Sequence, residues 1–333
     1  MKAFTVDRYQ SKDGLRAAEV PDPEVRDGDV LVQVHAASVN PLDIGIRDGE
    51  FRLILPYRLP QTLGNDLAGV VVWVGSRVRG FKPGDEVFAR PDKDRIGTSA
   101  EFIAVDEADL AHKPTTLDMA EAASLPLVAL TAWQALVERA DLKAGQKVLV
   151  HGGSGGVGTI AIQLAKHLGA TVATTTSTAN VEWMKRLGAD VVIDYRNQDF
   201  ETVVQDYDVV LDDQGGETLE KSLRVLKPGG IVIGLTGPPD PDFAKEIGAP
   251  WFVKPATKAL SYRTRQQAKR RQVRYSFLFM RADGDQLRQI ASLVDAGKIR
   301  PVVDQVFPFD STNEALAHAE HGHPKGKVVI KVR

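Results

Sequence analysis

The sequence contains no cysteine among its 333 residues. This absence excludes disulfides, thiolate zinc sites, iron–sulfur clusters and a cysteine nucleophile. Long apolar runs are also missing, because the longest, Leu67–Gly75, has about half the length of a membrane-spanning helix. The first ten residues alternate like a strand and carry no apolar segment behind their charges. We therefore expect no signal peptide and a cytoplasmic protein.

Neither sign of charge is in excess, since 42 Lys and Arg stand against 44 Asp and Glu. This balance gives no overall reason to expect a nucleic acid or a membrane as partner. One stretch departs from it: Tyr262–Arg274 is strongly basic, and no acid occurs from Lys254 to Arg274. An exposed cationic helix is the simpler interpretation. A patch for RNA or another polyanion is the alternative.

The chain up to about residue 120 is rich in β-branched runs. Val30–Ala36 and Leu67–Val74 are bounded by Gly, Pro and Asp, which predicts strands. The segment Pro41–Pro60 holds three prolines and mixed polarity, which favours a loop with at most short helical turns. We expect this part to form an irregular β-barrel or a folded sheet.

Strands and helices alternate from Lys147 onward, after a helical pattern over Met119–Val137 that Pro126 interrupts. The near-continuous apolar strands predict a parallel sheet covered on both faces. The tail, Val328–Val332, alternates again and is expected to pair with the first domain. The predicted class is α/β, with one domain over 1–121 completed by 284–333 and a second over 122–283. The predicted strands of the second domain are 147–151, 171–175, 190–194, 208–212 and 230–235, with 275–280 as a further candidate.

The sharpest motif is HGGSGGVG at His151–Gly158, which contains G-x-G-x-x-G between a strand and an amphipathic helix. Gly153 allows the tight turn, Gly155 and Gly156 let backbone N–H groups approach a pyrophosphate, and Gly158 lets the helix pack on the sheet. The positive end of the helix then faces the phosphates. This context predicts a dinucleotide site, against the alternative of a glycine-rich turn without a ligand. His151 is interpreted as a packed residue at the strand end.

The end of the second strand lacks the acid that usually binds an adenosine 2′-hydroxyl. It reads Thr174–Asn180, and no carboxylate follows until Glu182. Hydroxyl groups there can donate to a 2′-phosphate, and Arg196 is the nearest candidate cation, with Lys185 and Arg186 as alternatives. The sequence thus favours NADPH over NADH. The simpler interpretation of the threonines is a plain strand end, because Thr favours strands.

Nine segments together resemble the medium-chain dehydrogenase/reductase superfamily and, within it, the zinc-independent quinone-oxidoreductase-like branch. The resemblance covers essentially the whole chain. Its segments are SVNPLDIGIRDG (38–49), LGNDLAGVV (63–71), FKPGDEV (81–87), LPLVALTAW (125–133), the glycine loop, LGADVVIDYR (187–196), LKPGG (226–230), DAGKIRP (295–301) and GKVVIKV (326–332).

The resemblance implies an N-terminal GroES-like β-barrel domain, a Rossmann doubly wound parallel sheet, an active site in the cleft between them, and a homodimer. Zinc-dependent relatives have a Cys and a His-Glu pair where this sequence has Asn40, Asn65 and Asp66, which implies that catalytic zinc is absent. The residues expected to bind the cofactor are Asn40, Thr131, Gly153, Ser154, Gly155, Gly156, Val157, Thr175, Thr176, Ser177, Tyr195, Arg196, Leu235 and Lys327.

Without a Lewis acid, hydride transfer from NADPH requires an electrophilic acceptor such as a quinone or an α,β-unsaturated carbonyl. The resemblance implies that Asn40 and Thr131 line the nicotinamide end of the cleft, where they are expected to supply hydrogen-bond donors for the charge that develops on the carbonyl oxygen. Asp43 and Tyr57 complete the predicted catalytic set. For Tyr57 a half-buried packing role is the alternative, and for Asp43 a helix cap or turn role.

Two other functions remain open at this point. One is a metal-free NADP-dependent dehydrogenase or reductase of ordinary alcohols and ketones. The other is an NADPH-binding regulatory or RNA-binding protein without turnover. A run of histidines, His318, His321 and His323, is interpreted as a solvated helix end, with metal binding as the alternative.

Overall fold

The computed structural model describes residues 1–10, 14–52, 54–249, 251 and 253–333. The chain divides into two compact units. The first contains Met1–Leu130 and Arg281–Arg333, and the second contains Thr131–Met280. The predicted boundaries, 121/122 and 283/284, lie near these positions. Helix α3 (Pro126–Trp133) begins in the first unit and ends in the second.

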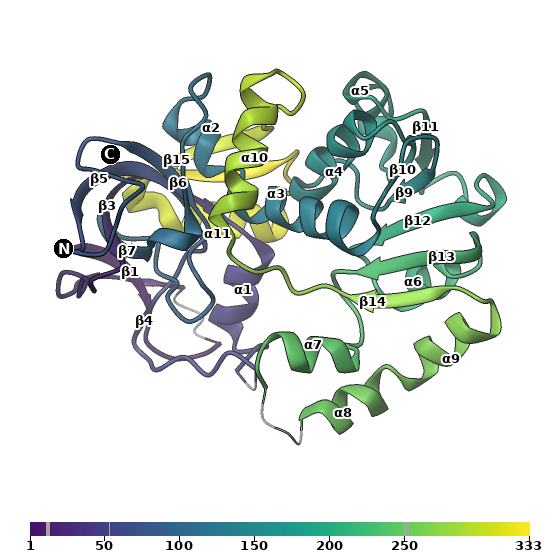
Figure 1. The fold of residues 1–333 in the computed structure, drawn as a ribbon, viewed down its shortest axis with the longest axis horizontal. Coiled ribbons are helices and arrows are strands. Elements are labelled where there is room, and N and C mark those ends of the chain that lie inside the picture. The colour runs from purple at the N-terminus through teal and green to yellow at the C-terminus, as the bar shows by residue number, and fades with distance from the viewer. Residues whose placement is uncertain (11–13, 53, 250, 252) are drawn as a thin grey trace. The chain divides into compact units, whose positions relative to one another are not determined.

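The first unit is built on two sheets (Figure 1). The smaller has the order β2-β1-β4, and the larger has the order β15-β16-β3-β5-β6-β8 with β7 also paired to β3. Alternating apolar residues on the long strands β3 and β5 face one core, as the period of two predicts. The strands are β1 (Lys2–Val6), β2 (Arg16–Glu19), β3 (Asp29–Val39), β4 (Gln61–Thr62), β5 (Asp66–Val74), β6 (Glu86–Ala89), β7 (Phe102–Asp106), β8 (Leu110–His112), β15 (Val303–Pro308) and β16 (Lys327–Lys331).

The C-terminal strand β16 pairs antiparallel with β3, which confirms the predicted return of the tail to the first domain. The prediction of a loop over Pro41–Pro60 is wrong at its start, because α1 is a helix over Pro41–Asp48. Proline is well placed at the first helical position, where its missing N–H would have no partner. The helices of this unit are α1, η1 (Glu107–Asp109), α2 (Met119–Ala123), α10 (Gly284–Asp295), η5 (Phe309–Ser311) and α11 (Thr312–His321).

The second unit is a parallel sheet with the order β11-β10-β9-β12-β13-β14. The chain order reverses between β9 and β12, which is the switch point of a doubly wound sheet. Buried Leu149, Ala173, Val210 and Val232 form the centre of its core. The strands are β9 (Lys147–Val150), β10 (Thr171–Thr176), β11 (Val191–Asp194), β12 (Tyr207–Asp212), β13 (Leu226–Gly234) and β14 (Arg274–Phe277).

Helices alternate with these strands, as predicted. Continuing from α3, a π-helical turn over Gln134–Arg139 leads into the unit. Within the described residues, no helix combines the length and the apolar character that crossing a bilayer requires. The helices are α4 (Gly156–His167), η3 (Thr178–Asn180), α5 (Val181–Leu187), η4 (Phe200–Thr202), α6 (Gly216–Ser222), α7 (Pro241–Glu246), α8 (Val253–Leu260) and α9 (Tyr262–Arg270).

Candidate functional site

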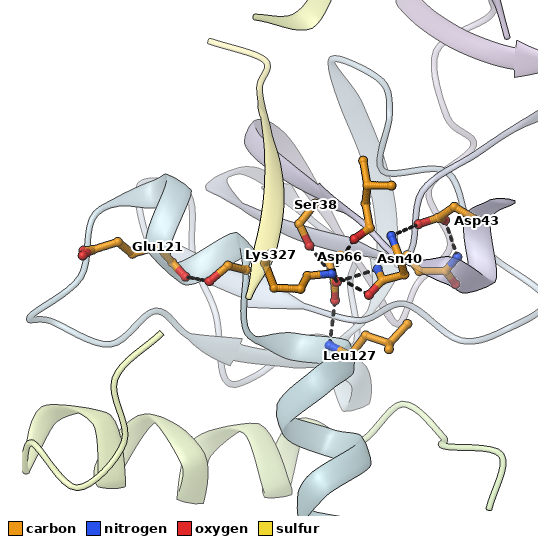
Figure 2. Close-up of polar contacts among 10 residues, drawn as sticks. Ser38, Asn40, Asp43, Asp66, Glu121, Leu127 and Lys327 are labelled. Carbon is orange, nitrogen blue, oxygen red and sulfur yellow. Dashed lines mark hydrogen bonds and ion pairs between the residues drawn. The ribbon is translucent and has the colours of Figure 1, made fainter. Parts of the chain in front are cut away.

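The carboxylate of Asp66 is the centre of a buried polar cluster in the first unit (Figure 2). Asp66 begins β5, and its side chain is 0% exposed. Both of its oxygens are satisfied, as a buried carboxylate requires. The donors are Ser38 Oγ at 2.8 Å, Asn40 Nδ2 at 2.8 Å, the Leu127 backbone N–H at 2.7 Å and Lys327 Nζ at 3.4 Å.

Lys327 brings a buried amine into this cluster from β16. Its residue is 5% exposed, and its Nζ donates to Val39 O at 2.6 Å and to Asn40 Oδ1 at 2.5 Å in addition to Asp66. Burial lowers the pKa of Lys327, and the nearby Asp66 and Asp43 carboxylates oppose that shift. The three acceptors, Val39 O, Asn40 Oδ1 and Asp66, account for all three N–H groups of the Lys327 ammonium.

The amide of Asn40 is fixed at both ends. Its Oδ1 accepts from Lys327, which can only donate, and its Nδ2 donates to Asp66. This pairing sets the orientation of the amide, because the reverse orientation would oppose two donors. The second N–H of Nδ2 has no acceptor among the described residues.

Asp43 lies beside this cluster, on the first turn of α1. Its carboxylate accepts from the Asn40 backbone N–H at 2.8 Å and from Asn65 Nδ2 at 2.7 Å. Burial raises the pKa of Asp43 to about 6, and the bonds from Asn65 and Asn40 only partly offset this rise. The Oδ1 atom of Asn65 is buried without a hydrogen-bond partner in the described part of the chain.

Tyr57 forms none of the hydrogen bonds of the Asn40, Asp43 and Asp66 side chains described above. Its hydroxyl donates to the backbone carbonyl of Lys93 at 2.6 Å, and burial raises its pKa. Nearby Arg90 is a cation that is 1% exposed. Its Nη1 donates to Pro91 O at 2.7 Å, but its Nε has no partner among the described residues. Burial lowers the pKa of Arg90.

The glycine loop of the second unit joins β9 to α4, as the motif predicts. Gly152 has a φ of +61°, and Gly155 is the N-cap of α4. A Cβ on Gly153 would lie 2.0 Å from Thr174 Oγ1, and one on Gly158 would lie 2.3 Å from Gly152 O. Both positions therefore require glycine, whereas the half-buried residues 154–157 remain open to a ligand at the helix start.

The predicted threonines divide into different roles. The hydroxyl of Thr175 contacts His151 Nδ1 at 3.1 Å and accepts from the Gly152 N–H at 3.3 Å, so it holds the loop. Thr176 is 2% exposed, and its hydroxyl has no partner among the described residues. Ser177 follows, half-buried, and its Oγ accepts from Asn180 at 3.3 Å. A buried hydroxyl without a partner is a position that a bound ligand would satisfy.

The carboxylate of Asp194, at the end of β11, lies next to these hydroxyl groups. The sequence analysis did not identify it. Asp194 accepts from Thr178 Oγ1 at 2.7 Å and from Asn197 Nδ2 at 2.6 Å. The Arg196 backbone N–H donates to it at 3.1 Å. Although β10 ends without a carboxylate, Asp194 of β11 places one beside the predicted adenosine end. The side chains of Tyr195 and Arg196 are exposed beside it.

Two predicted cofactor residues lie elsewhere in the second unit. Thr131 is on α3 and is 5% exposed. Leu235 follows β13, half-buried, and its N–H donates to Asp212 O at 2.8 Å. His151 is buried between Thr175 and Ser222, and burial lowers its pKa to about 4. It is therefore neutral near pH 7, as a packed residue should be.

The side chains of His318, His321 and His323 do not converge on one point. His318 contacts Asp304 at 2.8 Å, and His323 contacts the carbonyl of His321 at 3.0 Å. Within the described residues, no group of three or more His, Cys, Asp or Glu side chains is arranged to hold a metal ion.

The structure thus brings Asn40, Asp43 and Lys327 together in one unit, and the glycine loop, Thr175 and Thr176 together in the other. Sequence reasoning used Asp66 and Asn65 only as replaced zinc positions and missed their role in the cluster. Arg90 and Asp194 were missed as well. For Arg90 and Asp194 the sequence did offer a signal, since each is a charged residue at or directly after the C-terminal end of a strand.

Two family models match the chain. The model described as "Alcohol dehydrogenase GroES-like domain" matches residues 26–115. The model described as "Zinc-binding dehydrogenase" matches residues 187–330. The first match lies within the first unit, and the second begins at the end of α5 and extends to β16.

Similar proteins are named as oxidoreductases. The human "NAD(P)H oxidoreductase RTN4IP1, mitochondrial" is 38% identical over 100% of this chain and 89% of the relative. The "NADPH-dependent alkenal/one oxidoreductase, chloroplastic" of Arabidopsis thaliana is 38% identical over 99% of this chain and 79% of the relative. The solved structure of the quinone oxidoreductase from Coxiella burnetii is 33% identical, with a TM-score of 0.87 over 100% of this chain and 99% of that one.

Proposed function

The chain belongs to the medium-chain dehydrogenase/reductase superfamily, in its quinone-oxidoreductase-like branch, and is an NAD(P)H-dependent oxidoreductase; we propose that it reduces quinones or α,β-unsaturated carbonyls with NADPH and without catalytic zinc. The names of its relatives support this substrate class. The observation that carries the proposal is the buried cluster of Asn40, Asp66 and Lys327.

Zinc does not fit the donors of this cluster. The lone pairs of the Asp66 carboxylate are committed to four N–H or O–H donors, and Asn40 Oδ1 is committed to Lys327. The Lys327 amine on these oxygens occupies the position that a metal ion would need. The amide of Asn40 is also a poor ligand for Zn²⁺, which is usually bound by Cys, His and carboxylate groups. The proposed reaction therefore uses an acceptor that is already electrophilic.

The residues that would hold the nicotinamide dinucleotide fit such a ligand. The N–H groups of Ser154–Val157 at the start of α4 suit its pyrophosphate, and the unpartnered Thr176 hydroxyl suits its adenosine end. Tyr195, Arg196, Leu235 and Thr131 complete the proposed contacts. When bound, a reduced nicotinamide supplies the hydride.

Asn40 has a defined part in this proposal. Its second amide N–H donates to the carbonyl oxygen of the acceptor, where negative charge develops as hydride adds to the β-carbon. Asp66 and Lys327 act as positioning residues, because they set the orientation of that amide. Thr131 supplies a hydroxyl donor. Lys327 thus serves the site through Asn40, since its own N–H groups are used within the protein.

A proton must reach the α-carbon to complete the reduction. Asp43 and Tyr57 were both predicted for the catalytic set. Asp43 is the better candidate, because burial raises its pKa to about 6, closer to neutral pH than an ordinary carboxyl group, and because it adjoins Asn40. The Tyr57 hydroxyl already donates to Lys93 O, which supports its packing role.

The preference for NADPH rests on two features of the adenosine end. The Thr176 hydroxyl can donate to a 2′-phosphate, and the exposed Arg196 offers a cation. Asp194 acts against that preference through its negative charge, although three donors already surround it. We expect NADPH to bind more tightly than NADH, and comparable dissociation constants would contradict this part of the proposal.

Oxidation of NADPH by the chelator-treated protein tests the function. The acceptors are a quinone, an enal, an enone and a matched saturated ketone, with NADH in parallel. We expect turnover of the conjugated acceptors only. Turnover of the saturated ketone alone would support the alternative of an alcohol or ketone dehydrogenase, and tight cofactor binding without any turnover would support a regulatory protein.

Assembly and location are further parts of the proposal. A homodimer is proposed from the family resemblance, and light scattering would measure it. A cytoplasmic location is tested by fractionating cells, since several relatives carry mitochondrial or chloroplast names.

A further inference from the structure

The segment between β13 and β14 carries helices α7, α8 and α9. Its last part, with the first residue of β14, forms what we call the cationic arm, residues 253–274. The arm contains eight Lys and Arg residues and no acid. Figure 1 shows α8 and α9 beyond β14, the edge strand of the sheet. The balanced net charge of the whole chain therefore conceals a strongly positive region.

Most of these cations are not neutralised. Arg263 pairs with Glu220 at 3.2 Å, and the Arg265 guanidinium bonds to Ser261 Oγ and Lys258 O. Among the described residues, the other six cations of the arm form no ion pair. They are Lys254, Lys258, Lys269, Arg270, Arg271 and Arg274.

The outward face of α8 is unusual for a surface helix. The helix packs through the buried Thr257, with the equally buried Ser261 at its C-terminal end. Its outward residues are all exposed, and four of the six are apolar while the other two are lysines. They are Lys254, Pro255, Ala256, Lys258, Ala259 and Leu260. An outward face in water normally carries mixed polar and charged residues.

Large hydrophobic side chains are also exposed at both ends of α8. Trp251 is 86% exposed before the helix, Leu260 is 64% exposed on its last turn, and Tyr262 is 60% exposed just after it. These are the three most exposed large hydrophobic side chains in the described part of the chain. An apolar helix face with aromatic residues at its ends and lysines beside it is typical of helices that lie in a membrane interface.

We propose that the cationic arm docks on the anionic surface of a lipid bilayer, with α8 lying in the headgroup region. The unpaired cations attract the anionic lipids, and Leu260, Trp251 and Tyr262 enter the interface. This role goes beyond the proposed reductase function and does not depend on it. It also revises the expectation of no membrane partner, which used the charge of the whole chain.

Two other occupants explain the surface less well. A second copy of the chain would bring the same patch against itself in a twofold interface, so the unpaired cations would repel one another. RNA would be attracted by the charge and stack on the aromatic rings, but it gives no reason for the exposed Leu260, Ala256 and Ala259.

Vesicle co-sedimentation of the full chain tests the proposal. The probes are phosphatidylcholine vesicles with and without phosphatidylserine. We expect binding only to the anionic vesicles, and weaker binding as salt is raised. The double variant Lys254→Glu/Lys258→Glu should weaken binding at least about tenfold. The matched control, Lys82→Glu/Lys298→Glu, makes the same charge change at exposed lysines outside the arm and should bind nearly as well as the wild type.

Leu260→Ser separates insertion from charge attraction, and it should weaken vesicle binding while leaving the oligomeric state unchanged. Thermal unfolding and turnover of a water-soluble acceptor report that each variant is folded. The proposal is overturned if the wild type ignores anionic vesicles, or if the control loses as much binding as the arm variant. It is also overturned if Leu260→Ser dissociates an oligomer, or if only RNA binding responds to the arm variant.

Discussion

Asp43 is a carboxylic acid that the surrounding residues keep out of water, and this gives a pH dependence of stability. Its pKa of about 6 lies above the ordinary value of 3.8, so the folded protein holds the proton more tightly than the unfolded chain between about pH 4 and pH 6. The free energy of unfolding should therefore fall as pH rises through this window. The fall from this one group is at most about 3 kcal/mol.

Asp43→Asn isolates that contribution. The amide introduced by this substitution can accept from the Asn40 N–H, and it can donate to Asn65 once the Asn65 amide turns its unpartnered Oδ1 toward it. Urea unfolding of both proteins at pH 4.5 and pH 7 measures the difference. We expect the variant to gain stability relative to the wild type at the higher pH. An equal difference at both values would mean that Asp43 does not titrate in this window.

Asp194 should set part of the cofactor preference. Its carboxylate lies at Thr178, beside the predicted adenosine end, and a negative charge there repels a 2′-phosphate. Asp194→Asn should raise the ratio of NADPH to NADH affinity roughly twofold to fivefold, the effect of one partly exposed charge. Fluorescence titration with each cofactor gives the ratio. Asp199→Asn is the control, and an unchanged ratio in Asp194→Asn would contradict the placement of the phosphate.

Arg90 is a buried guanidinium without an ion-pair partner among the described residues. Burying a charge without a compensating partner destabilises the folded state. Arg90→Met keeps a long side chain and removes the charge, so we expect a higher melting temperature. Arg77→Met, at a guanidinium that is 75% exposed, should leave the melting temperature unchanged. A lower melting temperature for Arg90→Met would show that its hydrogen bond to Pro91 outweighs the burial of its charge.

Within the glycine loop, we expect one glycine to be needed for folding and another for cofactor binding, and substitutions by alanine to distinguish the two. A Cβ on Gly158 would lie 2.3 Å from Gly152 O and 2.7 Å from Gly153 Cα, so Gly158→Ala must displace the backbone. A Cβ on Gly155 would meet only Gly152 O, at 3.3 Å, and its φ of −80° suits alanine. We expect Gly158→Ala to lose about 1–3 kcal/mol of stability.

Gly155→Ala should instead keep its melting temperature and lose cofactor affinity, because the added methyl group occupies the space at the start of α4. Thermal unfolding and cofactor titration of both variants provide the comparison. If Gly155→Ala binds the cofactor like the wild type, the pyrophosphate does not lie at this turn.

The elements of the second unit could be predicted because their signals are local. Strand–loop–helix order, apolar runs and the glycine spacing all lie within a few residues of one another, and β9 to β12 follow the predicted bounds closely. Strand β13 begins at Leu226, before its predicted start at residue 230. Helix α1 was missed because the three prolines of 41–60 were weighed together. Asn40 before Pro41 was in fact a helix-start signal, since the chain enters α1 at this pair.

At the scale of the whole molecule, the candidate site could be predicted only in part. Lys327 meets Asn40 and Asp66 across sequence separations of 287 and 261 residues. No spacing rule predicts such contacts, which exist because β16 returns to pair with β3. The return of the tail was predictable from its alternation, and the family resemblance already placed Lys327 among the site residues. The burial of its amine and its contacts with Asn40 and Asp66 were not predictable.

In the proposed reaction, a hydride reaches the β-carbon of a conjugated acceptor without the help of a metal. The most direct measurement uses NADPH deuterated at the transferable position of the nicotinamide, an enone, and protein treated with a chelator, with the product examined by nuclear magnetic resonance. We predict a saturated ketone that carries deuterium on its β-carbon. Deuterium on the carbonyl carbon of an allylic alcohol, or loss of the reaction on chelation, would contradict the proposed reaction.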